Sequence, residues 1–128
     1  MYEVVVIVWK RRIFMQEKVI VAVDAMGGDN APAEIVKGVV DAVSQSENVI
    51  VKLVGQENVV SEELKKYTYR ESAIEIVNAT EVIETGEPPV MAIRRKKDSS
   101  IVVGLNLVKK GEADAFVSAG SSGAISVS

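Results

Sequence analysis

The sequence predicts an α/β fold, arranged as three α/β/α layers around a mostly parallel sheet. Short apolar runs rich in Val and Ile alternate along the chain with longer segments of helical periodicity, as in βαβ units. Aromatic residues make up only 5% of the chain while Val, Ile and Ala are abundant, which suits buried parallel strands covered by helices. The 128 residues are 48% hydrophobic, enough for one domain with a core.

The first half of the fold is expected to contain two strands and one helix. Residues 19–23 are fully apolar and too short for a helix, so they predict a strand. Residues 33–43 follow as a helix, because valines recur there at helical spacing and Asn30 with Pro32 forms a start signal. Residues 49–54, VIVKLV, predict the second strand.

The second half continues the alternation. A short polar helix is expected over residues 59–67 and a strand over 73–77. After a loop rich in helix breakers, Pro88 and Pro89 are expected to open a helix that runs through Lys97. The chain then offers Asp98-Ser99-Ser100 as caps for another helix, with Ile101, Leu105 and Val108 on one face, and residues 113–117 as a fourth strand.

Residues 1–14 are interpreted as an N-terminal extension, separate from a domain over residues 15–128. The apolar stretch 4–9 is too short to cross a bilayer, and its basic cluster follows it, the reverse of a signal peptide. The extension is expected to be an upstream start or an edge strand. The alternative is a membrane-surface foot that places Trp9 and three cations at the lipid headgroups.

Charge and composition exclude several classes of function. The net charge of −3 and the pI of about 5.1 do not indicate a nucleic-acid surface. The chain has neither Cys nor His, so disulfides, thiolate nucleophiles and the commonest general base and metal ligand are excluded. Any chemistry must use carboxylates, Lys, Arg, hydroxyls and backbone amides, and we expect no metal and no cofactor.

The string DAMGGDNAP follows the first expected strand and is the first candidate site. Ligands of open parallel sheets bind beyond the carboxyl ends of the strands, and the pair Gly27 and Gly28 lets backbone N–H groups converge on an anion. Asp24 and Asp29 repel phosphate and are better suited to orient a cation or a hydroxyl. The alternative is a tight βα turn in which Asp29 or Asn30 caps the next helix.

The string SAGSSGA, residues 118–124, is a second loop of the same physical type. In a parallel sheet it opens on the same rim as the first loop. An anion nest is favoured over a simple turn because two glycines flank two hydroxyl residues. The candidate residues of this loop are Ser118, Gly120, Ser121, Ser122 and Gly123.

The string RRKKDSS contains four consecutive cations. Because four successive helical residues point all round the axis, most of them are expected to offset the helix dipole and solvate the surface. The functional alternative needs only one, Lys96 or Lys97, to reach the rim and hold a phosphate or an acidic partner.

Two long strings in order, VAVDAMGGDNAP and EVIETGEPPVMAIRRKKDSSIVVGLNLVKKGEADAFVSAG, resemble the bacterial phosphate acyltransferases of phospholipid synthesis, the PlsX family. The resemblance runs from about Met15 to the end. It departs where the family often carries Asn-Thr and this chain has Ser121-Ser122. It implies a fold akin to phosphotransacetylase and isopropylmalate dehydrogenase. It also implies transfer of a long-chain acyl group from acyl carrier protein to inorganic phosphate by a homodimer that is cytoplasmic, with peripheral contact to the inner face of the membrane.

By this resemblance Gly27, Gly28, Asn30, Ser121 and Ser122 would surround the phosphate. Asp24 and Asp29 would orient the loop or a cationic partner, and Lys96 or Lys97 would face the acidic carrier protein. Family chains are far longer, so this chain is expected to be an N-terminal portion that is inactive alone. The alternatives are a short-chain phosphotransacetylase-like enzyme and a non-catalytic fragment that dimerises or binds an anion.

Overall fold

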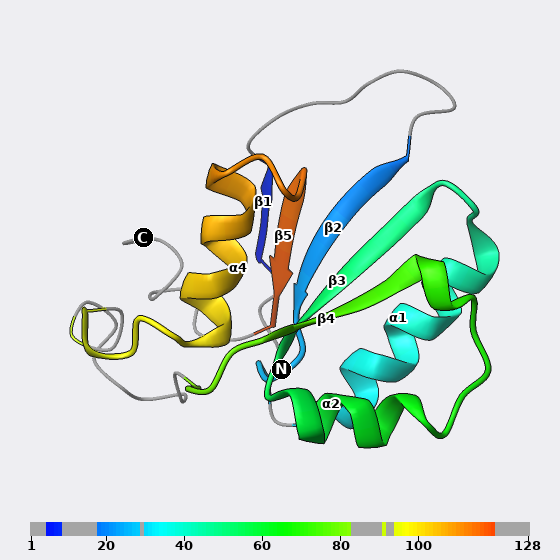
Figure 1. The fold of residues 1–128 in the computed structure, drawn as a ribbon, viewed down its shortest axis with the longest axis horizontal. Coiled ribbons are helices and arrows are strands. Elements are labelled where there is room, and N and C mark those ends of the chain that lie inside the picture. The colour runs from blue at the N-terminus through cyan, green and yellow to red at the C-terminus, as the bar shows by residue number, and fades with distance from the viewer. Residues whose placement is uncertain (1–4, 9–17, 29, 83–90, 92–93, 120–128) are drawn as a thin grey trace.

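The computed structural model describes residues 5–8, 18–28, 30–82, 91 and 94–119, and it confirms the α/β class. One sheet holds all the described strands, in the order β1-β5-β2-β3-β4, with β2 to β5 parallel to one another and β1 antiparallel to β5 (Figure 1). The strands are β1 (Val5–Val8), β2 (Val19–Asp24), β3 (Val49–Gly55), β4 (Ile74–Asn78) and β5 (Ala115–Ser118).

Helices cover both faces of this sheet and give the expected three layers. Figure 1 shows α1 and α2 together on one side of the strands and α4 on the other. A single 3-10 turn, Glu71–Ala73, leads into β4. The helices whose two ends lie among the described residues are α1 (Ala33–Gln45), α2 (Glu57–Leu64) and α4 (Ser100–Lys109).

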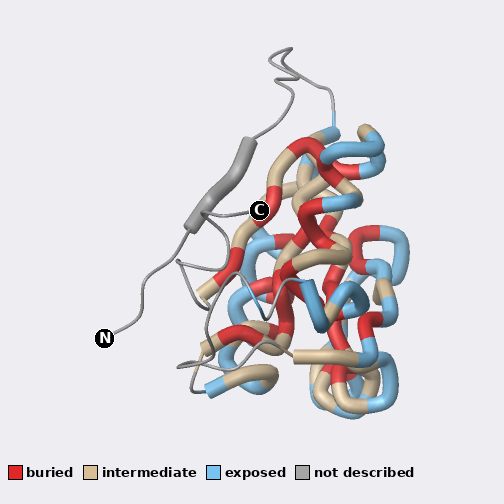
Figure 2. The backbone as a smooth tube through the Cα atoms, turned by 90° about the vertical axis from the view of Figure 1, so that its left-hand side faces the viewer, coloured by how far each residue is buried: buried red, intermediate tan, exposed pale blue. Residues whose placement is uncertain are grey.

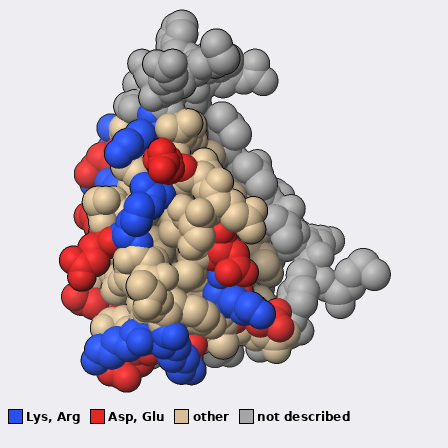
Figure 3. Space-filling model, turned by 90° about the vertical axis from the view of Figure 1, so that its right-hand side faces the viewer, with Lys and Arg blue, Asp and Glu red and all other residues tan. Residues whose placement is uncertain are grey.

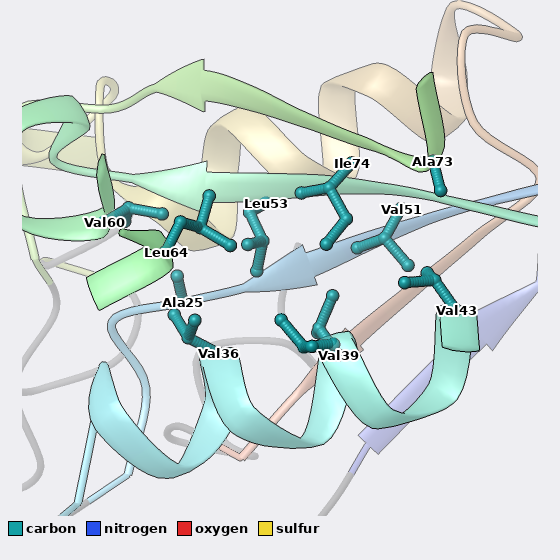
Figure 4. Close-up of a cluster of buried hydrophobic side chains, with 11 residues drawn as sticks. Ala25, Val36, Val39, Val43, Val51, Leu53, Val60, Leu64, Ala73 and Ile74 are labelled. Atoms are coloured by element: carbon teal, nitrogen blue, oxygen red, sulfur yellow. The ribbon is translucent and has the colours of Figure 1, made fainter. Parts of the chain in front are cut away.

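One hydrophobic cluster fills the space between the sheet and the two helices α1 and α2 (Figure 4). The valines that predicted α1 from their spacing are its buried residues, so the helical periodicity is confirmed. They pack against side chains of β3 and α2. The members with less than 5% exposure include Val36, Val43, Val51, Leu53, Val60 and Leu64.

A second hydrophobic cluster lies under α4, on the opposite face of the sheet. Ile101, Leu105 and Val108 are buried there, as their shared face predicted. They pack with Phe116 of β5, which is fully buried. Gly104 faces this ring so closely that a Cβ atom on it would overlap Phe116. Figure 2 marks the buried positions along the backbone in red.

Some predicted boundaries were wrong by two or three residues. Helix α2 spans Glu57–Leu64 rather than 59–67, because Gln56 takes the N-cap position and the side chain of Asn78 accepts a hydrogen bond from the Glu57 amide. Strand β5 begins at Ala115 rather than at 113. Residues before it are held by the backbone bond from the Asp114 amide to the Ile20 carbonyl, at 2.7 Å.

The helix predicted to run through Lys97 ends earlier. Of its described residues Met91, Arg94 and Arg95 are helical, whereas Lys96 and Lys97 are not. The chain turns there because residues 98–100 pair with the segment that leaves β4: the Glu81 amide donates to the Asp98 carbonyl, and the Ser100 amide donates to the Glu81 carbonyl. This pairing sets the start of α4, for which Ser99 is the N-cap.

The N-terminal extension supplies an edge strand, one of its two expected forms. Val5–Val8 pair with β5 at the end of the sheet opposite to β4. The basic cluster after it lies outside the described residues. Among the helices that the structure describes, none combines the length and the apolar character needed to span a bilayer.

Candidate functional site

The carboxyl ends of the parallel strands form one rim of the sheet. Strands β2 and β5 are direct neighbours in parallel register, from Val21 opposite Ala115 to Val23 opposite Val117. The loops that follow them therefore start side by side. This confirms, for the described residues of both loops, the prediction that they open on the same rim.

A buried hydrogen bond joins these two strand ends. The Ser118 hydroxyl donates to Oδ2 of Asp24 at 2.8 Å, and both side chains are only 1% exposed. The other carboxylate oxygen, Oδ1, accepts from the Met26 amide at 2.9 Å. Asp24 thus holds both its own loop and the end of β5.

The loop after β2 is also anchored on its β3 side. The Ala25 amide donates to the Val54 carbonyl at 2.9 Å. The Met26 side chain packs on Gly55, where a Cβ atom would stand 2.9 Å from Met26 Cγ. Because Gly55 has no side chain, the loop lies close against the sheet. The turn at residues 27 and 28 is therefore held from both sides.

A cavity of about 210 Å³ opens beside this turn. Residues from both loops and from the first turns of α1 line it, so the two candidate loops do share one space. Its described walls are Gly27, Gly28, Asn30, Ala31, Glu34, Ile35 and Ala119.

Gly28 has a backbone conformation of the kind found in anion-binding turns. Gly27 is buried, and Gly28 has a φ of 91°, a conformation that other L-residues rarely adopt. Among the described residues, neither backbone N–H donates to a protein acceptor. Two amides on the wall of a small cavity are donors of the kind that bind phosphate oxygens.

The start of α1 differs from the expected capped turn. Pro32, not Asn30, occupies the N-cap position and no side chain caps the helix. Asn30 instead contributes its backbone carbonyl, which accepts from the Glu34 amide at 3.1 Å. Of the two residues that the alternative of a capped turn named, Asn30 does not hold the N-cap position, and Asp29 lies outside the described residues.

Charge around the cavity does not by itself favour an anion. Glu34 is exposed and on the wall, and no Lys or Arg is among the described lining residues. Backbone dipoles therefore supply the positive potential on this part of the wall.

Lys96 lies elsewhere. Its Nζ donates to the Val82 carbonyl at 2.7 Å, so the ammonium group holds the segment that leaves β4 rather than the cavity wall. Lys97 is exposed and is not a lining residue either. Neither lysine is therefore among the described residues that line the cavity at Gly27 and Gly28.

A larger polar cavity, about 700 Å³, lies on the same rim beyond β3 and β4. Sequence reasoning missed it, although polar residues directly after two strands were a usable signal. One of its walls, Thr80, donates through both its hydroxyl and its amide to Asp98, at 2.6 and 3.0 Å. The lining residues are Gln56, Glu57, Asn58, Ser61, Asn78 and Thr80.

The remaining predicted site residues fall outside the described part of the chain. They are Asp29, Gly120, Ser121, Ser122 and Gly123. Within the described residues no three acidic side chains gather into a group that could hold a metal ion. On the face to the right in Figure 1, basic and acidic side chains are interspersed rather than segregated (Figure 3).

Comparison with known proteins identifies the relatives of this chain. A family model described as "Fatty acid synthesis protein" matches residues 19–128. A protein named phosphate acyltransferase from Clostridium acetobutylicum is 54% identical over 106 residues, covering 83% of this chain and 32% of the relative. Phosphate acyltransferases of Clostridium kluyveri and Syntrophomonas wolfei are 52% and 55% identical over 107 and 104 residues. This chain spans about a third of the length of these relatives.

Proposed function

Because this chain belongs to the fatty acid synthesis protein family, that of the phosphate acyltransferases, we propose that it is the N-terminal part of an enzyme that moves a long-chain acyl group from acyl carrier protein to inorganic phosphate. The relatives are named for acyl transfer to phosphate. We further propose that the acyl chain is long, that acyl carrier protein is the donor, and that the product is used in phospholipid synthesis.

The observation that carries the proposal is the junction of the two loops. Asp24 and Ser118 fasten the ends of β2 and β5 to each other, and the cavity beside them is lined by Gly27 and Gly28. A tetrahedral oxyanion is a small ligand, and backbone amides bind it without a cationic side chain. These features support the proposal that an anion binds at this rim.

The chemistry suits a chain without Cys or His. Phosphate is already an anionic nucleophile near neutral pH, so its oxygen attacks the thioester carbonyl without a strong protein base. The new C–O bond gives a tetrahedral oxyanion, and its collapse breaks the C–S bond. The products are an acyl phosphate and a thiolate, which takes a proton from solvent. The protein has to hold phosphate in line and to donate hydrogen bonds to the oxyanion.

In this mechanism the backbone amides of Gly27 and Gly28 hold phosphate. Asn30 lines the cavity, and the hydroxyls of Ser121 and Ser122 in the second loop complete the proposed phosphate-binding site. Asp24 is a positioning residue that acts through Met26 and Ser118. Asp29 orients the loop or a cationic partner, and one of Lys96 and Lys97 contacts the acidic carrier protein.

The family resemblance further supports a homodimer that works in the cytoplasm and touches the inner membrane surface. The interspersed charges on the face in Figure 3 favour carrier binding on another face, because an acidic partner is steered by a basic patch.

The test is a chimera in which residues 19–128 of this chain replace the matching part of the Clostridium acetobutylicum relative. Thiol release from acyl carrier protein thioester is followed with and without phosphate. We expect phosphate-dependent release, and we expect Gly28→Val to lower it by about 100-fold or more, because the valine distorts the turn and its donors.

Gly38→Ala is the matched control, since Gly38 lies on α1 with no atom within 4 Å of the added methyl group. Circular dichroism checks that both variants fold. Undiminished turnover in a folded Gly28→Val chimera would refute the loop assignment. Release that needs coenzyme A thioester instead of the carrier would indicate a short-chain phosphotransacetylase, and no release at all would indicate a non-catalytic fragment.

A further inference from the structure

Gly55 ends β3 on the same rim as the candidate site, although it is not among the residues that line the cavity at Gly27 and Gly28. Its backbone belongs to the sheet, because its carbonyl accepts from the Ala79 amide at 2.8 Å. Gly55 is buried and is not one of the described glycines with a positive φ. Its backbone conformation is therefore open to other residues, which leaves space as the reason for a glycine here.

The side chain of Met26 fills this space. A Cβ atom at residue 55 would stand 2.9 Å from Cγ and 3.0 Å from Sδ of Met26, and 3.1 Å from Cγ2 of Val60. Carbon atoms pack best at roughly 3.5–4.0 Å, so at least one of the two side chains has to move to admit a methyl group.

Met26 is the side chain that can move. Val60 is fully buried in the cluster between the sheet and the helices α1 and α2, where a displaced valine would press on other packed side chains (Figure 4). Met26 is only partly buried where it packs against this cluster. A methyl group on residue 55 would therefore push Met26 away from β3.

A shift of Met26 acts directly on the proposed phosphate donors. The peptide plane between Met26 and Gly27 carries the Gly27 N–H, so the backbone torsion of Met26 sets the direction of that bond. The Met26 amide is held by Oδ1 of Asp24 at 2.9 Å. Because the chain is fixed on that side, a displaced Met26 is accommodated by rotation on the other side, where two glycines offer little resistance.

We propose that Gly55 is a positioning residue of the anion site, because the space that it leaves holds Met26 in the place that directs the Gly27 N–H toward phosphate. Gly55 acts through Met26 and touches no ligand. The inference rests on the proposed function for its ligand, since it takes phosphate to be bound by Gly27 and Gly28.

The test is a double-mutant cycle on the 128-residue chain, with phosphate binding followed through the ¹H–¹⁵N signals of Gly27 and Gly28. We expect Gly55→Ala to weaken phosphate binding by about tenfold or more, because a hydrogen bond to a charged ligand is misdirected. In the Met26→Ala background the same change should weaken binding by less than about twofold, because the Cγ and Sδ atoms that the methyl group would meet are absent.

Val60→Ala is the matched control background. It removes the other close contact at residue 55 but leaves Met26 in place. There Gly55→Ala should still weaken phosphate binding by about tenfold. A general loss of stability would act alike in both backgrounds, so equal effects would overturn the proposal. Unchanged phosphate affinity of a Gly55→Ala chain that circular dichroism shows to be folded would also overturn it.

A second measurement separates this proposal from the proposed function. Without phosphate, the ¹H–¹⁵N residual dipolar coupling of Gly27 reports the direction of its N–H bond. We expect Gly55→Ala to change this coupling in the unaltered background but not in the Met26→Ala background. If the coupling responds in this way and the unaltered chain binds no phosphate, the positioning by Gly55 stands and the proposed anion site fails. If phosphate binds and the coupling is unchanged in folded Gly55→Ala, the positioning role is wrong.

The unaltered chain tests the packing if Gly55→Ala does not fold. Nuclear Overhauser cross-peaks should join the Cγ protons of Met26 to the Hα protons of Gly55, because the two groups are in contact. Folding should also return when Met26→Ala is added to Gly55→Ala. Missing cross-peaks, or a double variant that stays unfolded, would overturn the proposal.

Discussion

Both carboxylate oxygens of Asp24 accept hydrogen bonds from other parts of the protein. Oδ1 accepts from the Met26 amide and Oδ2 from the Ser118 hydroxyl, and the side chain is almost fully enclosed. A buried charged acceptor that loses a donor is destabilised by the desolvation of the unpaired oxygen. The pair therefore contributes to the stability of the rim.

Removing the Ser118 hydroxyl should destabilise the fold. We expect Ser118→Ala to lower the free energy of unfolding by about 1–3 kcal/mol, because Oδ2 of Asp24 stays buried without this donor. Urea unfolding followed by circular dichroism measures the change. Ser44→Ala is the control, since the exposed Ser44 hydroxyl only donates to the Val40 carbonyl in its own helix. Equal effects of the two substitutions would contradict the special role of the buried pair.

Asp98 is the described residue with a resolved shift in acidity. The Thr80 hydroxyl, and then the Thr80 amide, hold the pKa of Asp98 below its ordinary value of 3.8. A lowered pKa means that the bond stabilises the fold fully above pH 3.8, and that this contribution is lost as the pH falls through the folded-state pKa. The effect is small because the carboxylate is exposed.

Thr80→Val should move the titration midpoint of Asp98 upward toward 3.8. Valine removes the hydroxyl, the larger cause, and keeps the backbone donor. The midpoint is read from the side-chain carboxyl ¹³C signal of Asp98 as a function of pH. Thr68→Val, at an exposed position in the segment before β4, should leave it unchanged. A midpoint in the unaltered chain at or above 3.8 would contradict the assignment.

At the level of secondary-structure elements, the local pattern of apolar residues predicted the parallel strands and the helices α1 and α4. Apolar runs predicted β2 and β3 to within one residue, and valine spacing predicted the buried face of α1, because these features depend on burial alone. The end of the helix before Lys96 was not predictable, because the pairing of Glu81 with residues 98–100 is a long-range contact. The start of α2 likewise depends on Asn78, twenty-one residues away.

The same limit applies to the candidate site. The sequence places the first and last loops on one rim, since parallel neighbours share their carboxyl ends. It does not reveal that Ser118 bonds to Asp24, or that Lys96 is engaged by the Val82 carbonyl, because both depend on side-chain placement across separate elements. The polar cavity beyond β3 and β4 was missed for the same reason.

Two helical glycines should respond in opposite ways to alanine. Gly104→Ala inserts a methyl group into the Phe116 ring, so we expect a loss of about 1–3 kcal/mol in the free energy of unfolding despite the better helix propensity. Gly38→Ala meets no atom within 4 Å and should gain about 0.5–1 kcal/mol. Chemical denaturation of both variants measures the difference. A stabilising Gly104→Ala would mean that α4 packs differently on β5.

For the molecule as a whole, size limits which ligands the cavity at Gly27 and Gly28 can enclose. The cavity at Gly27 and Gly28 has about 210 Å³, below the roughly 300–1,000 Å³ of sites that enclose a drug-sized ligand. Phosphate is small enough for it, whereas a long acyl thioester is not. Binding of the anion and turnover of the donor are therefore separable properties, and this chain by itself should have only the first.

We therefore expect the isolated chain to bind phosphate and to release no thiol from acyl carrier protein thioester above the rate in buffer. Titration with phosphate should shift the ¹H–¹⁵N signals of Gly27 and Gly28, because their amides would donate to its oxygens. Gly38, on the exposed side of α1, is the internal control and should not move. Turnover by the isolated chain equal to that of the chimera would show that the described residues already form a complete active site. If phosphate leaves the signals of Gly27 and Gly28 unmoved, the proposed phosphate site at these glycines is wrong.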